Sequence, residues 1–165
     1  MDYITNDDSL CEPTAYFFGY FGIAIAMSLS SLGSAFGIGK SGVGAVAASL
    51  MSPRQIVKLS LPVILAGVLG IFGLITSIII MVKINDAYAY KNAYAHLAAG
   101  ICTGVSALAA GLAIGVAGNA GSRACARNER LFTALLLCLV FGEALAIFGL
   151  LISLILSVAS AGACP

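Results

Sequence analysis

The chain has 165 residues, of which 61% are hydrophobic and only 9% are charged, and its formal net charge at pH 7 is +1. A water-soluble domain carries about a quarter charged residues, so this composition excludes an ordinary soluble globule. The small net charge also excludes a basic protein built to bind nucleic acid.

Four long stretches with almost no charge follow one another along the chain. They cover residues 13–39, 59–82 and 92–122, and in the last stretch, 131–165, Glu143 is the one charged residue. Each stretch reaches the roughly 20 residues that cross about 30 Å of hydrocarbon as a helix. Only helices and closed barrels satisfy the backbone in lipid, and these runs are too long for barrel strands. The sequence therefore predicts an all-α membrane protein with four transmembrane helices.

Short connections join the expected helices and favour an antiparallel bundle of two hairpins. Pro53 lies in the first connection, where its ring disfavours a continuing helix, and Pro62 is able to bend the second helix. An acidic leader, residues 1–14, lacks the positive region of a cleaved signal peptide. The expected helices cover residues 15–50, 55–83, 92–127 and 128–161.

The distribution of basic residues predicts the orientation in the membrane, because connections rich in lysine and arginine stay in the cytoplasm. The first and third connections hold six basic residues, whereas the middle connection, 84–95, holds Lys91 and has Lys83 at its edge. We therefore expect the middle connection and both termini on the lumenal side. The basic residues are Lys40, Arg54 and Lys58 in the first connection, Lys83 and Lys91 around the second, and Arg123, Arg127 and Arg130 in the third.

An internal repeat appears when the chain is shifted by 76 residues without a gap. Residues 71–74, Ile-Phe-Gly-Leu, then fall on the same four residues at 147–150. Other matches are Ser30 with Ser106, Gly39 with Gly115, Gly42 with Gly118 and Arg54 with Arg130. The chain is therefore interpreted as two tandem helical hairpins, 15–83 and 96–161, in the same membrane orientation. This is a parallel duplication rather than the inverted repeat of many transporters.

The first and third helices are rich in small residues, whereas the second and fourth carry bulky aliphatic and aromatic ones. Small residues let helix backbones approach closely in lipid. We expect the small-residue helices to form a tight inner layer, an arrangement that closes naturally when copies assemble into a ring. These small residues are Ser30, Gly33, Ser34, Gly37 and Gly39, and then Gly100, Gly104, Ala107, Gly111 and Gly115.

Glu143 is the residue for which the sequence indicates a chemical function. It follows Arg130 by 13 residues, which is roughly 20 Å along a helix and close to the middle of the bilayer. A carboxylate at that depth is expensive and marks a functional site by default. Its helical neighbours are apolar and no basic residue is expected at its depth, so the protonated form is favoured. Glu143 is interpreted as a reversible proton or cation carrier, with a structural carboxyl bonded between helices as the alternative.

The sequence of residues 141–150, Phe-Gly-Glu-Ala-Leu-Ala-Ile-Phe-Gly-Leu, resembles the c-subunit proteolipid of eukaryotic vacuolar-type proton-pumping ATPases. Gly67 falls on Glu143 in the repeat, so the first hairpin has no carboxylate there. The resemblance extends from about Tyr16 to Val158 and includes Met51-Ser52-Pro53-Arg54.

This resemblance implies a membrane rotor ring of c-type subunits, identical or mixed, that turns past a stationary a subunit and contacts the central stalk. It implies that Glu143 carries the proton and reacts with carbodiimides. Gly67, Phe72, Gly142 and Ala146 are expected around this site. It further implies that other subunits hydrolyse ATP, and that the ring lies in the membrane of a vacuole or another acidic compartment.

No cofactor or metal is expected. Residues 37–41, Gly-Ile-Gly-Lys-Ser, lack the earlier glycine of a phosphate-binding loop, because Ser34 occupies its position. The five cysteines show no paired spacing, and His96 is alone at the start of the third helix. A sodium-translocating rotor and a passive pore or structural proteolipid remain the alternative functions. The apolar residues expected near Glu143, among them Leu69, Phe72 and Ile114, favour the proton over sodium.

Overall fold

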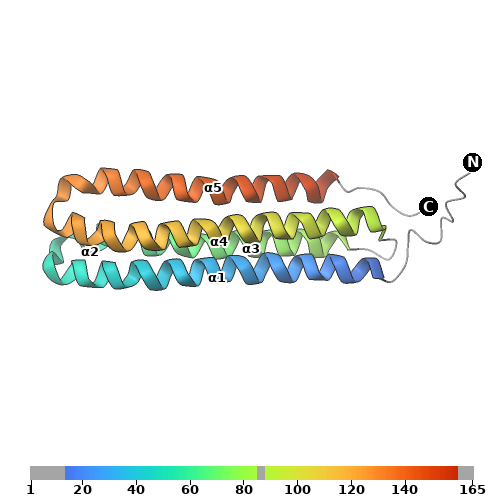
Figure 1. Cartoon of the computed structure of the whole chain (residues 1–165), viewed down its shortest axis with the longest axis horizontal. Coiled ribbons are helices and arrows are strands. Elements are labelled where there is room, and N and C mark those ends of the chain that lie inside the picture. The colour runs from blue at the N-terminus through green and yellow to red at the C-terminus, as the bar shows by residue number, and fades with distance from the viewer. Residues whose placement is uncertain (1–13, 85–87, 160–165) are drawn as a thin grey trace, which may run out of the picture.

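The structure is a computed structural model of the whole chain, and it describes residues 14–84 and 88–159. The acidic leader, apart from Thr14, and part of the expected middle connection lie outside the described residues. Nearly all described residues are helical, and the long helices lie side by side along one axis (Figure 1). The helices are α1 (Thr14–Met51), α2 (Ile56–Leu59), α3 (Leu61–Lys83), α4 (Tyr90–Arg127) and α5 (Phe132–Ala159), with short 3₁₀ turns at Pro53–Gln55 and Glu129–Leu131.

Four helical segments of the described chain are long and apolar enough to cross a membrane. The prediction of four transmembrane helices is therefore confirmed, with ends that differ from the expected ones by a few residues. The segments are Thr14–Met51, Pro53–Lys83, Tyr90–Arg127 and Glu129–Ala159.

The second expected helix is interrupted at Ser60, where α2 ends and α3 begins. Pro62 explains the break, since it has no N–H to donate to the carbonyl of Lys58 and its ring crowds that carbonyl. The Ser60 carbonyl instead accepts from the Val63 and Ile64 N–H groups at 3.0 and 3.3 Å. The expected uninterrupted helix over 55–83 is wrong at this point. The interruption lies two residues before Pro62.

The fourth expected helix starts later than Asn128. The side chain of Asn128 accepts a hydrogen bond of 3.2 Å from the Arg130 N–H and caps the turn Glu129–Leu131. Side-chain capping of this kind satisfies a backbone donor that has no partner within the helix. The regular helix α5 follows from Phe132.

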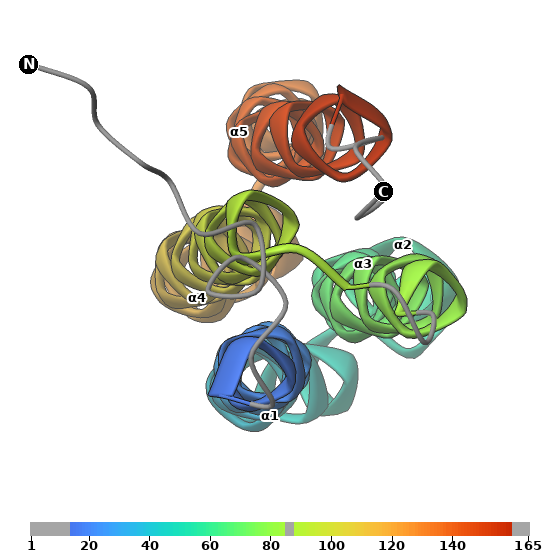
Figure 2. The same ribbon diagram turned by 90° about the vertical axis from the view of Figure 1, so that its right-hand side faces the viewer.

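Helix α4 lies at the centre of the bundle. Seen end-on, it lies between α1 and α5, with α3 alongside (Figure 2). Contacts join α4 to each of these three helices, and α3 also contacts α1 and α5. Helix α5 therefore packs against α4 and α3.

Glycines allow α1 and α4 to touch backbone to backbone. A Cβ atom at Gly33 would meet the Cα of Leu108 at 2.6 Å, and one at Gly111 would meet the backbone of Gly33. Gly44 shows the same relation to Asn119 near the other end of the seam. The expected close packing of the two small-residue helices is therefore present. Gly39, one of the small residues expected in the inner layer, is instead exposed and faces open space.

The repeat is visible in the packing as well as in the sequence. In the first hairpin, Gly73 of α3 leaves room for the side chain of Ser30 on α1. In the second, Gly149 of α5 leaves the same room for Ser106 on α4. Gly73 and Gly149 are 76 residues apart, and so are Ser30 and Ser106. The two hairpins therefore use the same helix–helix contact.

The connections on the side of α2 are tied together by polar contacts. Lys58 forms a 2.8 Å ion pair with Glu129, and both side chains are more than half exposed. Ser52 donates to the carbonyl of Ala126 at 3.0 Å, and Ser122 donates to that of Leu59 at 3.3 Å. An exposed ion pair adds little stability, so the buried bond from Ser122 contributes more to the register of α2 on α4.

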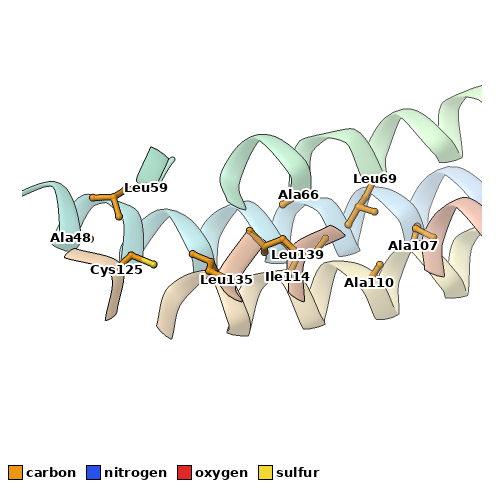
Figure 3. Close-up of a cluster of buried hydrophobic side chains, with 11 residues drawn as sticks. Ala48, Leu59, Ala66, Leu69, Ala107, Ala110, Ile114, Cys125, Leu135 and Leu139 are labelled. Carbon is orange, nitrogen blue, oxygen red and sulfur yellow. The ribbon is translucent and has the colours of Figure 1, made fainter. Parts of the chain in front are cut away.

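The larger hydrophobic core lies mainly between α3, α4 and α5, with Ala48 from α1 and Leu59 from α2 (Figure 3). It is built mainly from alanine and leucine, which allows the helices to pack closely. Its buried members are Ala48, Leu59, Ala66, Leu69, Ala107, Ala110, Ile114, Cys125, Leu135, Leu139 and Ala146.

Candidate functional site

Glu143 lies on the buried face of α5 and is only 8% exposed. Its flanking residues on that face, Leu139 one turn before and Ala146 one turn after, are each 1% exposed and belong to the core. The opposite face of α5 carries Phe141 and Leu145, which are 64% and 63% exposed. The carboxyl therefore lies inside its own chain rather than on the outer surface of the bundle.

The surroundings of the carboxyl are apolar. Gly142, the residue before it, faces Ile114 of α4, and a Cβ added there would meet Ile114 Cγ1 at 3.2 Å. Leu69 of α3 and Ile114 are 0% and 1% exposed and belong to the same core as Leu139 and Ala146. The core next to Glu143 is thus apolar and receives side chains from α3, α4 and α5.

Neither oxygen of Glu143 has a hydrogen-bond partner among the described residues, although both are buried. The ion pair found in that part of the chain, Lys58 with Glu129, lies in the connections and not at this depth. A buried carboxylate without a partner is costly, whereas the neutral acid is much less so. Lys40 lies within α1 and not in the expected first connection, and its Cβ is 3.3 Å from the Cβ position of Gly115, the residue after Ile114. The expectation of no basic residue near this depth is therefore wrong. Lys40 is exposed and forms no ion pair with Glu143, so the surroundings of the carboxyl favour its neutral form.

The residues expected around Glu143 differ in what they do. Ala146 is a buried member of the core, Phe72 packs against it while partly buried, and Gly142 allows α5 to approach Ile114. Gly67 behaves differently, because a Cβ there would meet no atom within 4 Å. Ala146, Phe72 and Gly142 thus lie in or against the core next to Glu143 along α5, whereas Gly67 leaves open space. Their role at the carboxyl stays a prediction.

Three buried hydroxyl groups meet on the side of the core toward the C-terminus of α5. Thr76 Oγ1 lies 3.1 Å from Thr103 Oγ1 and 3.4 Å from Ser153 Oγ. All three side chains are 0% exposed. Sequence reasoning did not single them out, although each is a polar residue within a largely apolar run.

His96 is buried and bonded, as expected of a structural histidine. The Tyr88 hydroxyl lies 2.5 Å from its Nδ1, and the ring also donates to the backbone carbonyl of Ser157 near the end of α5. Tyr88 packs on Tyr16 of α1, with ring centroids 5.5 Å apart. Burial raises the pKa of Tyr88 to about 12, so its hydroxyl keeps its proton at any physiological pH. These contacts tie α1, α4 and α5 at one end of the bundle.

Metal-binding groups do not gather in the part of the chain that the structure describes. No three His, Cys, Asp or Glu side chains there lie close enough to hold an ion. Cys102, Cys125 and Cys138 are free thiols on α4 and α5.

Comparison with known proteins matches both hairpins to one family. The model of the ATP synthase C-subunit family matches residues 21–80 and again residues 97–156. The two matches begin 76 residues apart, the same interval as the internal repeat. The duplication is therefore confirmed independently of the alignment of the chain with itself.

A curated relative matches almost the whole chain. It is the V-type proton ATPase 16 kDa proteolipid subunit of Chrysotila carterae, 46% identical over 154 residues, which are 90% of this chain and 94% of the relative. The four apolar helices and the doubled family match agree with this likeness. The protein belongs to the ATP synthase C-subunit family and is a c-subunit proteolipid of the V-type proton ATPase kind.

Proposed function

We propose that this chain is a proton-carrying subunit of the rotor ring in a V-type ATPase, with Glu143 as the group that binds the proton. The observation that supports this most directly is the buried carboxyl of Glu143, which has no partner on either oxygen among the described residues. A carboxyl that only joined helices would accept or donate a hydrogen bond, because an unsatisfied buried polar group costs free energy.

The physical basis of transport is the difference between the two charge states of one side chain. The neutral acid can travel through the apolar part of the membrane, and the carboxylate cannot do so cheaply. Rotation would carry neutral Glu143 groups around the ring. Ionisation would occur only where the a subunit offers water and a positive charge. Each charge moved against 100 mV requires about 2.3 kcal/mol, which ATP hydrolysis in other subunits would supply.

Assembly and division of labour follow from the same proposal. Copies of this chain, alone or with other c-type subunits, would form the ring, which contacts the a subunit and the central stalk. The exposed apolar faces of α1, α3 and α5 suit neighbouring copies and lipid. The chain itself would catalyse no reaction, and the motor would acidify a vacuole or another endomembrane compartment.

The transported ion is proposed to be the proton rather than sodium. A hard cation needs several oxygen ligands to replace its hydration shell. The core around Glu143 presents Leu69, Ile114 and Phe72 instead. A single carboxyl can bind a proton covalently in such surroundings, but it cannot solvate a metal ion.

Carbodiimide labelling tests this assignment, because the reagent modifies only the protonated carboxyl. Labelling of Glu143 in the intact ring is expected to fall as the pH rises and to be the same with and without sodium at constant pH. The extent of modification is measured by mass spectrometry of the peptide that contains Glu143, with the Glu143→Gln ring as the control. Protection by millimolar sodium at constant pH would contradict the proton assignment.

The orientation is proposed from the basic connections, with the α3–α4 connection and both termini in the lumen. Lys91 and Arg127 lie at opposite ends of α4 and are both exposed. In a chain whose own cysteines are replaced by alanine, Arg127→Cys is expected to react with an impermeant maleimide on sealed vesicles that expose their cytoplasmic face. Lys91→Cys is expected to react only after detergent is added. The reverse pattern would overturn the orientation.

A further inference from the structure

We propose that Thr76, Thr103 and Ser153 form a hydroxyl junction that holds α5 at one rotation against α3 and α4, and so keeps the Glu143 carboxyl on the inner face of its chain. Each of the three residues comes from a different helix, and each is fully buried. This inference rests on the proposed function of Glu143. It assigns these residues a positioning role for the proton-binding group.

Hydrogen bonding in the junction is directional. The Ser153 hydroxyl donates to the carbonyl of Leu150 at 2.8 Å, so its oxygen is free to accept from Thr76. Thr76 can in turn accept from Thr103 at 3.1 Å. Each hydroxyl has one proton, and that of Thr76 is also directed to the Phe72 carbonyl of its own helix at 3.1 Å. The Thr76 proton is therefore divided between Phe72 and the longer contact to Ser153, and the bond from Thr103 is the stronger of the two interhelical contacts. The bonds therefore link α4 to α3 and α3 to α5.

The rest of the contact between α5 and its neighbours is less directional. Around Glu143 it consists of aliphatic side chains, Leu135, Leu139 and Ala146 among them. Burial of apolar surface depends on area rather than on angle, so these contacts resist rotation of the helix weakly. Beyond the junction, the contact from His96 to the Ser157 carbonyl fixes the same part of α5. The hydrogen bonds are thus concentrated on the side of Glu143 toward the end of α5.

The junction can act on Glu143 because a helix transmits rotation along its axis. Ser153 follows Glu143 by ten residues on the uninterrupted helix α5, a distance of about 15 Å. A turn of α5 that opened the junction would move Glu143 away from Ile114 and Leu69 toward the outer surface. With the junction intact, the carboxyl leaves the core only by a change of its own side-chain rotamer.

The first test compares isosteric substitutions on the intact ring. Thr76→Val removes the hydroxyl and keeps the shape. The initial rate of Glu143 labelling by a lipid-soluble carbodiimide is expected to rise by about threefold for each interhelical bond lost. Thr76→Ser keeps a hydroxyl and is expected to retain the parent rate. Thr133→Val makes the same chemical change at an exposed position of α5 and serves as the control. An unchanged rate in Thr76→Val would overturn the proposal.

The second test does not depend on whether Glu143 carries protons. The chain has no tryptophan, so Phe141→Trp provides a single probe on the outer face of α5, where Phe141 is 64% exposed. Quenching of this probe by brominated lipid is expected to differ between the parent and Thr76→Val rings, and not between the parent and Thr133→Val rings. Equal quenching in all three would show that α5 keeps its rotation without the junction.

Ring assembly is measured alongside both tests. If Thr76→Val does not assemble, Ser153→Ala, which removes one hydroxyl from α5, is used in the same two assays. If Ser153→Ala also fails to assemble while Thr76→Ser succeeds, the hydroxyls maintain the fold rather than position the carboxyl, and the proposal is wrong. If quenching differs between the parent and Thr76→Val rings but Glu143 is not labelled in the parent ring, the proposed function is refuted. The role of the junction in holding α5 is then still supported.

Discussion

Replacing Glu143 by glutamine is expected to abolish ATP-driven proton transport while leaving the ring assembled. Glutamine has nearly the shape of the protonated acid, and the site holds the side chain in apolar surroundings with no hydrogen-bond partner among the described residues. The amide can neither release nor take up a proton at physiological pH. Transport is measured as acidification of vesicles, and assembly as ring yield after mild detergent extraction. Acidification at the parent rate would exclude Glu143 as the carrier.

Glu143→Asp provides the matched comparison, because it keeps the titratable group and moves it by one methylene. We expect partial transport in this variant. Mixed rings sharpen the test further: if every carboxyl must pass the a subunit in turn, one glutamine copy stalls the whole ring. Transport should then fall far more steeply than the fraction of Gln-containing chains. A linear decrease would show that the subunits work independently, as they would in a passive pore.

Replacing Gly111 by alanine is expected to disrupt the α1–α4 seam and prevent assembly of the ring. The added methyl would overlap the backbone of Gly33, with the Gly33 Cα only 2.8 Å away. Backbone atoms cannot turn aside as a flexible side chain can, so the two helices must separate along the seam. Overpacking of a core costs about 1–3 kcal/mol, and Gly111→Leu should cost more than Gly111→Ala.

Gly39→Ala is the matched control on α1. A Cβ there would meet nothing within 4 Å, so the same chemical change leaves the fold of the chain intact. Thermal stability of the purified chain in detergent and ring yield are the two measurements. Equal stability of the Gly111→Ala and Gly39→Ala chains would contradict the close approach of α1 and α4.

Much of this protein is determined by sequence features that act locally. The charge-free runs specify four helices because the bilayer excludes other backbone structures. The repeat of 76 residues follows from the sequence and reappears in the family match and in the Gly73–Ser30 and Gly149–Ser106 contacts. Glu143 is also recognisable from the sequence, because burying an ionised carboxyl in an apolar helix costs free energy whatever the arrangement of the helices. The break at Ser60 was missed because the run over 59–82 contains no charge and Pro62 alone marked it.

The tertiary structure alone decided which way each side chain faces. Small and polar residues such as Gly142, Gly149 and Ser153 mark one side of the 28-residue helix α5, but their spacing does not say which neighbour that side contacts. Only packing shows that Glu143 points inward and Phe141 outward. The same applies to Gly39, which is one of the small residues expected in the inner layer but faces open space. Thr76, Thr103 and Ser153 lie far apart in the chain and form a junction only because three helices meet. Composition and spacing act along one helix, whereas rotation about its axis is set by its neighbours. The sequence by itself therefore singled out the carboxyl, and the packing of α3, α4 and α5 decided where it lies.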